Sequence, residues 1–191
     1  TYADILEMSS CLECPVGTFS VKFGGVGPGG CDNCTAGQFL NAAGHDSCNL
    51  CPVGKYSPGV KETQCTACEV GKATLAAVSS SCTPCTPGEY ASVESSIVCE
   101  QCPTGKYSQG YMNIEFLECD KGSYQPASSQ AVCIAADVGQ FVDAKRQGTF
   151  KLCDAGTFND LQNATRCKDC AAGSYQDTTG QATCIVCDYG H

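Results

Sequence analysis

Cysteine is the residue that dominates the chemistry of this chain, because 19 of its 191 residues are cysteine. Most of them occur in Cys-x-x-Cys pairs. Two such pairs can supply four thiolates to a zinc ion, whereas oxidised pairs form disulfide bonds. Leu, Ile, Val and Phe account for only 33 residues, too few for an ordinary single core in a chain of this length. Covalent links between cysteines must therefore supply part of the stability that a hydrophobic core gives an ordinary domain.

The cysteines recur with a period of 17 residues. One series falls at Cys31, Cys48, Cys65, Cys82, Cys99, Cys133, Cys167 and Cys184, and a second lies three residues later, at Cys34, Cys51, Cys68, Cys85, Cys102, Cys119, Cys153, Cys170 and Cys187. Three positions of the two series hold Phe116, Ala136 and Phe150 instead. A fixed short period predicts a tandem array of one small structural unit.

Each period also carries a glycine and, with one exception, an aromatic residue. The glycine comes three residues after the second cysteine, as in Gly54, and the aromatic follows two residues later, as in Tyr56; only Ala73 breaks the aromatic series. Glycine suits a turn with positive φ or a close backbone approach, and the aromatic suits the first strand of a short hairpin. We expect a small, disulfide-rich, mainly β fold with little or no helix, an elongated solenoid or rod of stacked 17-residue β-hairpins in which aromatic packs on aromatic.

The array is expected to be uneven along the chain. Residues 1–10 are read as the end of a preceding repeat, 11–34 as a first repeat with a glycine-rich insertion, 35–115 as regular repeats, 116–153 as degenerate repeats that lack some cysteines, and 154–191 as regular repeats again. The array is expected to continue beyond both ends. The insertion, Gly24 to Gly30, is interpreted as a hairpin tip, since no Gly-Lys-Ser/Thr of a phosphate-binding loop follows it.

Three disulfide schemes fit the spacing. In the first, the second cysteine of a pair joins the first cysteine of the next, giving Cys14–Cys31, Cys34–Cys48, Cys51–Cys65, Cys68–Cys82, Cys85–Cys99, Cys119–Cys133, Cys153–Cys167 and Cys170–Cys184, and leaving Cys11, Cys102 and Cys187 for partners outside the fragment or none. The second joins the first cysteine of one pair to the second of the next and leaves Cys170 alone. The third bridges each Cys-x-x-Cys internally and leaves Cys119, Cys133 and Cys153 without partners.

Spacing does not separate the first two schemes. We favour the first because it closes each hairpin on itself, and each such loop contributes about 3 kcal/mol in the chain-entropy model.

Other candidate sites are weaker. His45 and Asp46 are adjacent but accompany no nucleophile motif, so we expect no catalytic residues and no enzyme activity. The scattered Asp32, Asp120, Asp154 and Asp188 do not form an Asp-x-Asp-x-Asp-Gly calcium loop. Zinc is also disfavoured, because zinc ribbons do not need a glycine and an aromatic in every copy, so no metal or other cofactor is expected. Asn33 and Asn163 stand in Asn-x-Thr sequons and are candidate glycosylation sites.

The charge and the hydropathy restrict the partners. A net charge of −9 disfavours nucleic acid and anionic membranes, both of which select basic surfaces. No apolar run approaches the length of a membrane span. The density of cysteine favours an oxidising, extracellular or cell-surface location.

The motif Cys51-Pro52-Val53-Gly54-Lys55-Tyr56-Ser57 leading to Cys65-Thr66-Ala67-Cys68 resembles the ephrin-receptor-like cysteine-rich repeat, which is similar to tumour-necrosis-factor-receptor modules. Matching motifs begin at Cys14 and Cys102, and the resemblance extends over residues 11–191. It implies an extracellular rod of small modules without catalytic activity, and it supports the first disulfide scheme. The strict period and the degenerate stretch 116–150 depart from the receptors of the family.

Two functions follow as hypotheses. The first is an extracellular structural scaffold, a segment or subunit of a filament, flagellar hair or surface coat, whose partners are copies of itself, other coat proteins and glycans. The second is a receptor or adhesin ectodomain that binds a protein along one face. Tyr111, Met112, Ile114, Phe116 and Leu117 place unusual apolar weight at one point of the array and mark the best candidate for such a face.

Overall fold

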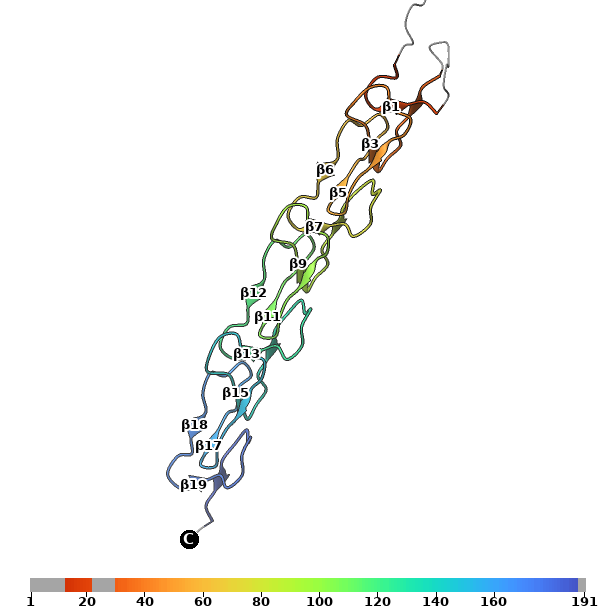
Figure 1. Cartoon of the computed structure of the whole chain (residues 1–191). Helices are drawn as coiled ribbons and strands as arrows, with labels where there is room; N and C mark the ends of the chain where they lie inside the picture. The colour runs from red at the N-terminus through yellow and green to blue at the C-terminus, as the bar shows by residue number, and fades with distance from the viewer. Residues whose placement is uncertain (1–12, 22–29, 189–191) are drawn as a thin grey trace, which may run out of the picture. The chain divides into compact units, whose positions relative to one another are not determined.

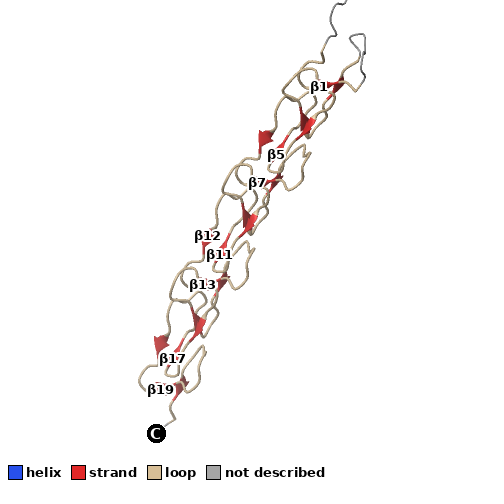
Figure 2. Ribbon diagram, in the orientation of Figure 1, coloured by secondary structure: helices blue, strands red, loops and turns tan. Residues whose placement is uncertain are grey.

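The computed structural model describes residues 13–21 and 30–188. The predicted segment 1–10, Cys11 and most of the glycine-rich insertion lie outside the described residues. Within the described part of the chain there are twenty two-residue strands and no helix. Figure 2 shows these strands in red, joined by loops. This confirms the predicted small, disulfide-rich, mainly β fold.

The chain divides into two compact units, residues 1–84 with 93–98 and residues 85–92 with 99–191. Each odd-numbered strand pairs with the strand that follows it to form an antiparallel hairpin (Figure 1). The first unit holds β1 (Thr18–Phe19) with β2 (Asp32–Asn33), β3 (Gln38–Phe39) with β4 (Asn49–Leu50), β5 (Lys55–Tyr56) with β6 (Thr66–Ala67), and β7 (Lys72–Ala73) with β8 (Thr83–Pro84).

The second unit holds six more hairpins. They are β9 (Glu89–Tyr90) with β10 (Glu100–Gln101), β11 (Lys106–Tyr107) with β12 (Leu117–Glu118), β13 (Ser123–Tyr124) with β14 (Ile134–Ala135), β15 (Gln140–Phe141) with β16 (Lys151–Leu152), β17 (Thr157–Phe158) with β18 (Lys168–Asp169), and β19 (Ser174–Tyr175) with β20 (Ile185–Val186).

The repeating motif explains the local structure of each hairpin. In hairpin β5–β6, Pro52 to Lys55 form a β-turn in which the Lys55 amide donates to the Pro52 carbonyl at 3.1 Å. Gly54 has a φ of 76°, which a type II turn requires at its third residue. The chain then enters β5, and the two residues between the cysteines form β6. The glycine therefore turns the chain into the first strand, and the polar residues between the strands form the hairpin tip.

Besides the second cysteine position, a second buried position lies at the residue after the aromatic position, in every repeat from Leu40 to Gln176. Leu40, Ser57 and Val142 are buried at this position, whereas the aromatics before them are half-buried. The expected packing of aromatic on aromatic from strand to strand is therefore not the main core contact among the described residues. The physical reason is that the residue after the aromatic bonds to the next repeat through its own backbone, which places its side chain between the two repeats.

Backbone hydrogen bonds tie neighbouring repeats together within each unit. In the first unit the Gly37 amide donates to the Ser57 carbonyl at 2.9 Å, and the Ser57 amide donates to the Ser79 carbonyl at 3.0 Å. In the second unit the Gly122 amide bonds in the same way to Val142, at 2.9 Å. Each unit is therefore held by main-chain contacts that do not depend on the type of the exposed side chains.

Candidate functional site

Eight disulfides close the hairpins. They join Cys14–Cys31, Cys34–Cys48, Cys51–Cys65, Cys68–Cys82, Cys85–Cys99, Cys119–Cys133, Cys153–Cys167 and Cys170–Cys184. These are the pairs of the first scheme. Among the described cysteines Cys102 and Cys187 are free, and Cys11 lies outside the described residues.

The secondary structure explains why a Cys-x-x-Cys pair does not bridge internally. The two residues between its cysteines form a strand, as Thr66 and Ala67 do in β6. In extended chain, residues three apart have Cα atoms about 10 Å from each other. A disulfide needs Cα atoms within about 7 Å, and Cys51 and Cys65, for example, lie 5.7 Å apart.

Within each unit, repeats also contact the repeat two positions further along through a glycine of the motif, at Gly17, Gly37, Gly54, Gly88, Gly105, Gly122 and Gly139. A Cβ atom placed on Gly54 would lie 2.1 Å from the Ser95 carbonyl oxygen, and one placed on Gly105 would lie 2.2 Å from the Arg146 carbonyl oxygen. The glycine therefore meets both conditions that its sequence pattern indicated, a positive φ and a close backbone approach. The approach links three consecutive repeats, because the residue that contacts the glycine lies in the hairpin tip of the second repeat after the glycine's own repeat.

One position of the hairpin tip has a left-handed backbone in every described tip from Gly44 to Gly180, and it includes the residues that approach the glycines named above. Lys61, Val78, Ser95, Met112, Ser129, Arg146 and Asn163 occupy this position with φ between 57° and 64°. A β-branched residue such as Val78 is unusual there. The amide of each of these residues donates to the carbonyl of the residue in the second cysteine position one repeat earlier, as Arg146 does to Cys119 at 2.9 Å. The 17-residue spacing of these tip residues was the only available signal, and the sequence interpretation missed the position.

Two hairpins lack a disulfide because a cysteine is replaced. Cys102 is fully buried opposite the position of Phe116, and the Phe116 ring lies edge-on to the Tyr90 ring with centroids 5.2 Å apart. Ala136 is fully buried in the repeat that ends with Phe150, whose ring packs on Tyr124, also at 5.2 Å. In both repeats the phenylalanine packs on the aromatic of the preceding repeat.

The Phe116 ring has two polar neighbours. The Lys106 ammonium lies 3.8 Å above its centroid, a cation–π contact. The Tyr90 hydroxyl donates a hydrogen bond of 2.7 Å to the Glu100 carboxylate. This bond raises the pKa of Tyr90 above its usual value, and burial and the negative charge of Glu100 act in the same direction. Tyr90 is therefore held as a neutral donor beside the ring.

Exposed ion pairs follow the repeat in the second unit. Lys151 contacts Asp143 at 2.7 Å and Lys168 contacts Asp160 at 2.5 Å, in equivalent positions of successive hairpins. In each pair the hydrogen bond that the lysine donates to the carboxylate lowers the pKa of the aspartate. Because the groups are exposed, water and salt screen them, and they contribute to surface charge more than to stability.

Two further ion pairs connect different repeats. Lys145 contacts Asp120 at 2.7 Å, and the Arg146 guanidinium contacts the Glu118 carboxylate. The hydrogen bond from Arg146 lowers the pKa of Glu118, and the bond to Asp120 raises the pKa of Lys145. Both ion pairs lie within residues 116–150, the stretch in which cysteines of the two series are replaced.

One hairpin tip exposes several apolar side chains. Tyr111 is 69% exposed, Met112 46%, Ile114 51% and Leu117 48%. Tyr111, Met112 and Ile114 lie between the strands and Leu117 begins β12. These four residues, called the 111–117 tip below, come from the repeat that lacks a disulfide between Cys102 and Phe116. Phe116 itself packs inward, so the structure separates it from the other residues of the predicted apolar face.

The two sequons lie on the surface of the described residues. Asn33 is exposed in β2, and Asn163 is exposed in a hairpin tip with a φ of 62°. Both side chains are accessible to a glycosyltransferase. Whether they carry sugar stays a prediction.

The remaining candidate residues are not gathered at one place. Among the described residues, no group of three or more His, Cys, Asp or Glu lies close enough to hold a metal ion. His45 and Asp46 are exposed, and Asp46 accepts a hydrogen bond from Ser47. Asp120 pairs with Lys145. That the chain is not an enzyme stays a prediction.

Within the described part of the chain, no helix is long and apolar enough to cross a membrane. A comparison with protein families finds that residues 37–81 and 156–191 match the family described as tyrosine-protein kinase ephrin type A/B receptor-like. A comparison with curated proteins finds no match.

Proposed function

Because residues 37–81 and 156–191 belong to the ephrin-receptor-like family of cysteine-rich repeats, we propose that the chain is a structural segment of an extracellular filament, flagellar hair or cell-surface coat. Disulfides persist in oxidising compartments, and eight of them indicate an extracellular or cell-surface location. Partners of the chain are copies of itself, other coat proteins and glycans.

The observation that carries the proposal is the contact of seven repeat glycines, from Gly17 to Gly139, with the hairpin tip two repeats away. Within a unit, a repeat cannot move without breaking backbone hydrogen bonds to the next repeat and the close approach to the one after it. Each bridged hairpin is also closed covalently. An array built in this way resists extension through its main chain and leaves its exposed side chains free to vary, as a structural segment requires.

Single-molecule pulling tests the mechanical part of this function. In seven of the eight bridged repeats a disulfide spans 14 residues, as Cys34–Cys48 does, and Cys14–Cys31 spans 17; a span of 14 residues shields about 50 Å of extended chain from force. We expect the oxidised protein to extend little when it unfolds. After reduction, each bridged repeat should release about 50 Å more, and equal lengths before and after reduction would contradict the mechanism.

Assembly is tested separately. The secreted chain should form filaments or sheets that are visible by negative-stain electron microscopy as its concentration rises. A chain that stays monomeric at every concentration, and that instead binds another protein in a one-to-one complex, would contradict a filament or coat role.

A receptor or adhesin ectodomain is the second candidate function, favoured by the 111–117 tip. Ile97, Val78 and Ile134 are also exposed at the positions equivalent to Ile114, Met112 and Leu117, but only this repeat adds the 69% exposed Tyr111 to them, and such a cluster is typical of an interaction surface. Replacement of Tyr111 and Ile114 by serine should then abolish binding of the secreted chain to its target cells. The same change at the exposed Val60 and Leu75 of the first unit is the matched control. Equal binding by both variants would remove this candidate.

A further inference from the structure

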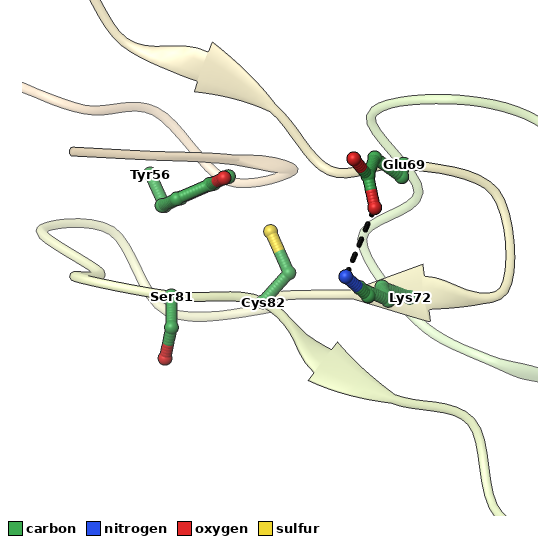
Figure 3. A pocket seen from close by; sticks show the side chains of 5 residues that line it. All are labelled: Tyr56, Glu69, Lys72, Ser81 and Cys82. Carbon is green, nitrogen blue, oxygen red and sulfur yellow. Dashed lines mark hydrogen bonds and ion pairs between the residues drawn. The ribbon is translucent and has the colours of Figure 1, made fainter. Parts of the chain in front are cut away.

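The first unit contains a small hollow between two successive repeats. It has a volume of about 110 Å³ and is lined by Tyr56, Glu69, Lys72, Ser81 and Cys82. Figure 3 shows Tyr56 on one side of Cys82 and the ion pair between Lys72 and Glu69 on the other. The ion pair, 2.9 Å long, holds the lysine at the edge of the hollow.

The second unit shows what fits at this position. Thirty-four residues on, two full periods, the equivalents of Tyr56, Lys72 and Cys82 are Tyr90, Lys106 and Phe116. There the Phe116 ring packs edge-on against Tyr90 and lies under the Lys106 ammonium. In the first unit, Cys82 is bonded to Cys68 and sends no ring into the equivalent space.

The same arrangement occurs once more in the second unit. The Phe150 ring packs against Tyr124, again where a cysteine of the series is replaced. At both positions without a bridging cysteine, an aromatic ring lies beside the aromatic of the preceding repeat. The site is therefore suited to an aromatic ring, with an edge-to-face partner and, next to Lys72, a cation for the ring face.

We propose that this hollow receives the ring of Tyr111 from a second copy of the chain. Tyr111 is the most exposed aromatic side chain of the described residues, at 69%, and it stands on a hairpin tip with exposed Met112 and Ile114. In the hollow the ring packs on Tyr56 and Lys72 in the way that Phe116 packs on Tyr90 and Lys106 in the second unit. The phenol hydroxyl, which phenylalanine lacks, can bond to one of the polar side chains of the lining, Ser81 or Glu69.

The contact joins two different surfaces, the hollow and the tip that carries Tyr111. Each copy can therefore bind one neighbour through its hollow and a second neighbour through its Tyr111. Such a heterologous contact builds open-ended assemblies unless it closes into a ring. A single ring and its neighbours bury far less than the roughly 1,000 Å² of a stable interface, so the contact is weak for one pair and effective only when it is repeated along an assembly. The inference rests on the proposed filament or coat role and names one contact within it.

Sedimentation over a range of concentrations tests the energetic part. Tyr111→Ser should raise the dissociation constant for self-association at least tenfold, the effect of losing a well-packed aromatic anchor. Tyr175→Ser is the matched control, since Tyr175 is also an exposed aromatic of the second unit, at 47%, and should leave association unchanged. Equal association of Tyr111→Ser and the unsubstituted chain overturns the inference.

Photo-crosslinking tests the position. With p-benzoylphenylalanine at position 111, crosslinks between copies should map to the peptides that carry Tyr56, Lys72 or Ser81. Crosslinks elsewhere, in a chain that still assembles, overturn this contact and leave the filament or coat role standing. A chain that does not self-associate at all overturns both.

Discussion

Two neighbouring hairpins of the second unit have the same backbone conformation, although only one of them is closed by a disulfide. Hairpin β13–β14 is closed by Cys119–Cys133, and hairpin β15–β16 has Ala136 and Phe150 at these positions. The hydrogen bond that ends each hairpin is nearly the same length, 2.8 Å from Ala136 to Gly122 and 2.9 Å from Cys153 to Gly139. The strand register is equivalent too. Backbone contacts between repeats therefore shape the hairpin, and the disulfide acts chiefly on the unfolded chain.

The largest expected effect breaks a backbone contact in a hairpin that has no disulfide. Gly105→Ala places a Cβ atom 2.2 Å from the Arg146 carbonyl oxygen, at a φ of 73°. We expect a loss of about 3–5 kcal/mol of unfolding free energy, measured by chemical denaturation, because a steric clash adds to the backbone strain.

Gly156→Ala is the matched control for this glycine. Its φ of 83° is similar, but a Cβ atom there meets no atom within 4 Å. Only the backbone strain remains, about 1–2 kcal/mol. Equal losses for the two variants would show that the contact across two repeats contributes nothing.

The second prediction removes a disulfide from a bridged hairpin. Cys119→Ser with Cys133→Ser should lower the unfolding free energy by about 3 kcal/mol, as expected for a loop of this size. The amide chemical shifts of β13 and β14 should change little. Loss of the β13–β14 register in those spectra would mean that the bond, and not the backbone contacts, shapes the hairpin.

A matched variant copies the neighbouring hairpin. Cys119→Ala with Cys133→Phe reproduces the pair Ala136 and Phe150, and the new ring should pack on Tyr107. We expect this variant to be about 1 kcal/mol more stable than the double serine variant, the usual contribution of an aromatic pair.

The third prediction adds the missing bond. Phe116→Cys should form a disulfide with Cys102, detectable by mass spectrometry as the loss of two hydrogens. The expected net gain is about 1–2 kcal/mol, since about 3 kcal/mol from loop closure is offset by the lost contacts of the Phe116 ring with Tyr90 and Lys106. A free thiol at both positions under oxidising conditions would mean that the hairpin differs from its bridged neighbours.

The smallest effect concerns the exposed ion pairs of hairpins β15–β16 and β17–β18, Lys151–Asp143 and Lys168–Asp160. The pKa of Asp143 and Asp160 is lowered in the folded chain. Their ionised forms therefore add stability above about pH 4, and this contribution is lost as the pH falls through the lowered folded values. Asp143→Asn should flatten the dependence of the urea midpoint on pH slightly, and 1 M salt should mask the difference. A midpoint that rises on acidification would have the wrong sign.

The fold class and the hairpin unit were predictable from particular residues. The cysteine series marked the period, Gly54 and its equivalents marked the turn, and Tyr56 and its equivalents marked the first strand. These signals are local, because a positive φ needs glycine and a short strand favours an aromatic. The hollow beside Tyr56 was not predictable, since its outline depends on the packing of two repeats and on the absence of an aromatic ring at position 82.

The sequence by itself determined the period, the turn and the β-hairpin of this protein, together with a short set of disulfide schemes. Only the tertiary structure decided which position is buried and which tip residue approaches the glycine. Leu40, Ser57 and Asn159 share the buried position, and Lys61 and Val78 share the left-handed tip, without a common side chain. The reason is physical: backbone amides and carbonyls of neighbouring repeats select these positions, and a backbone hydrogen bond leaves almost no mark on residue type.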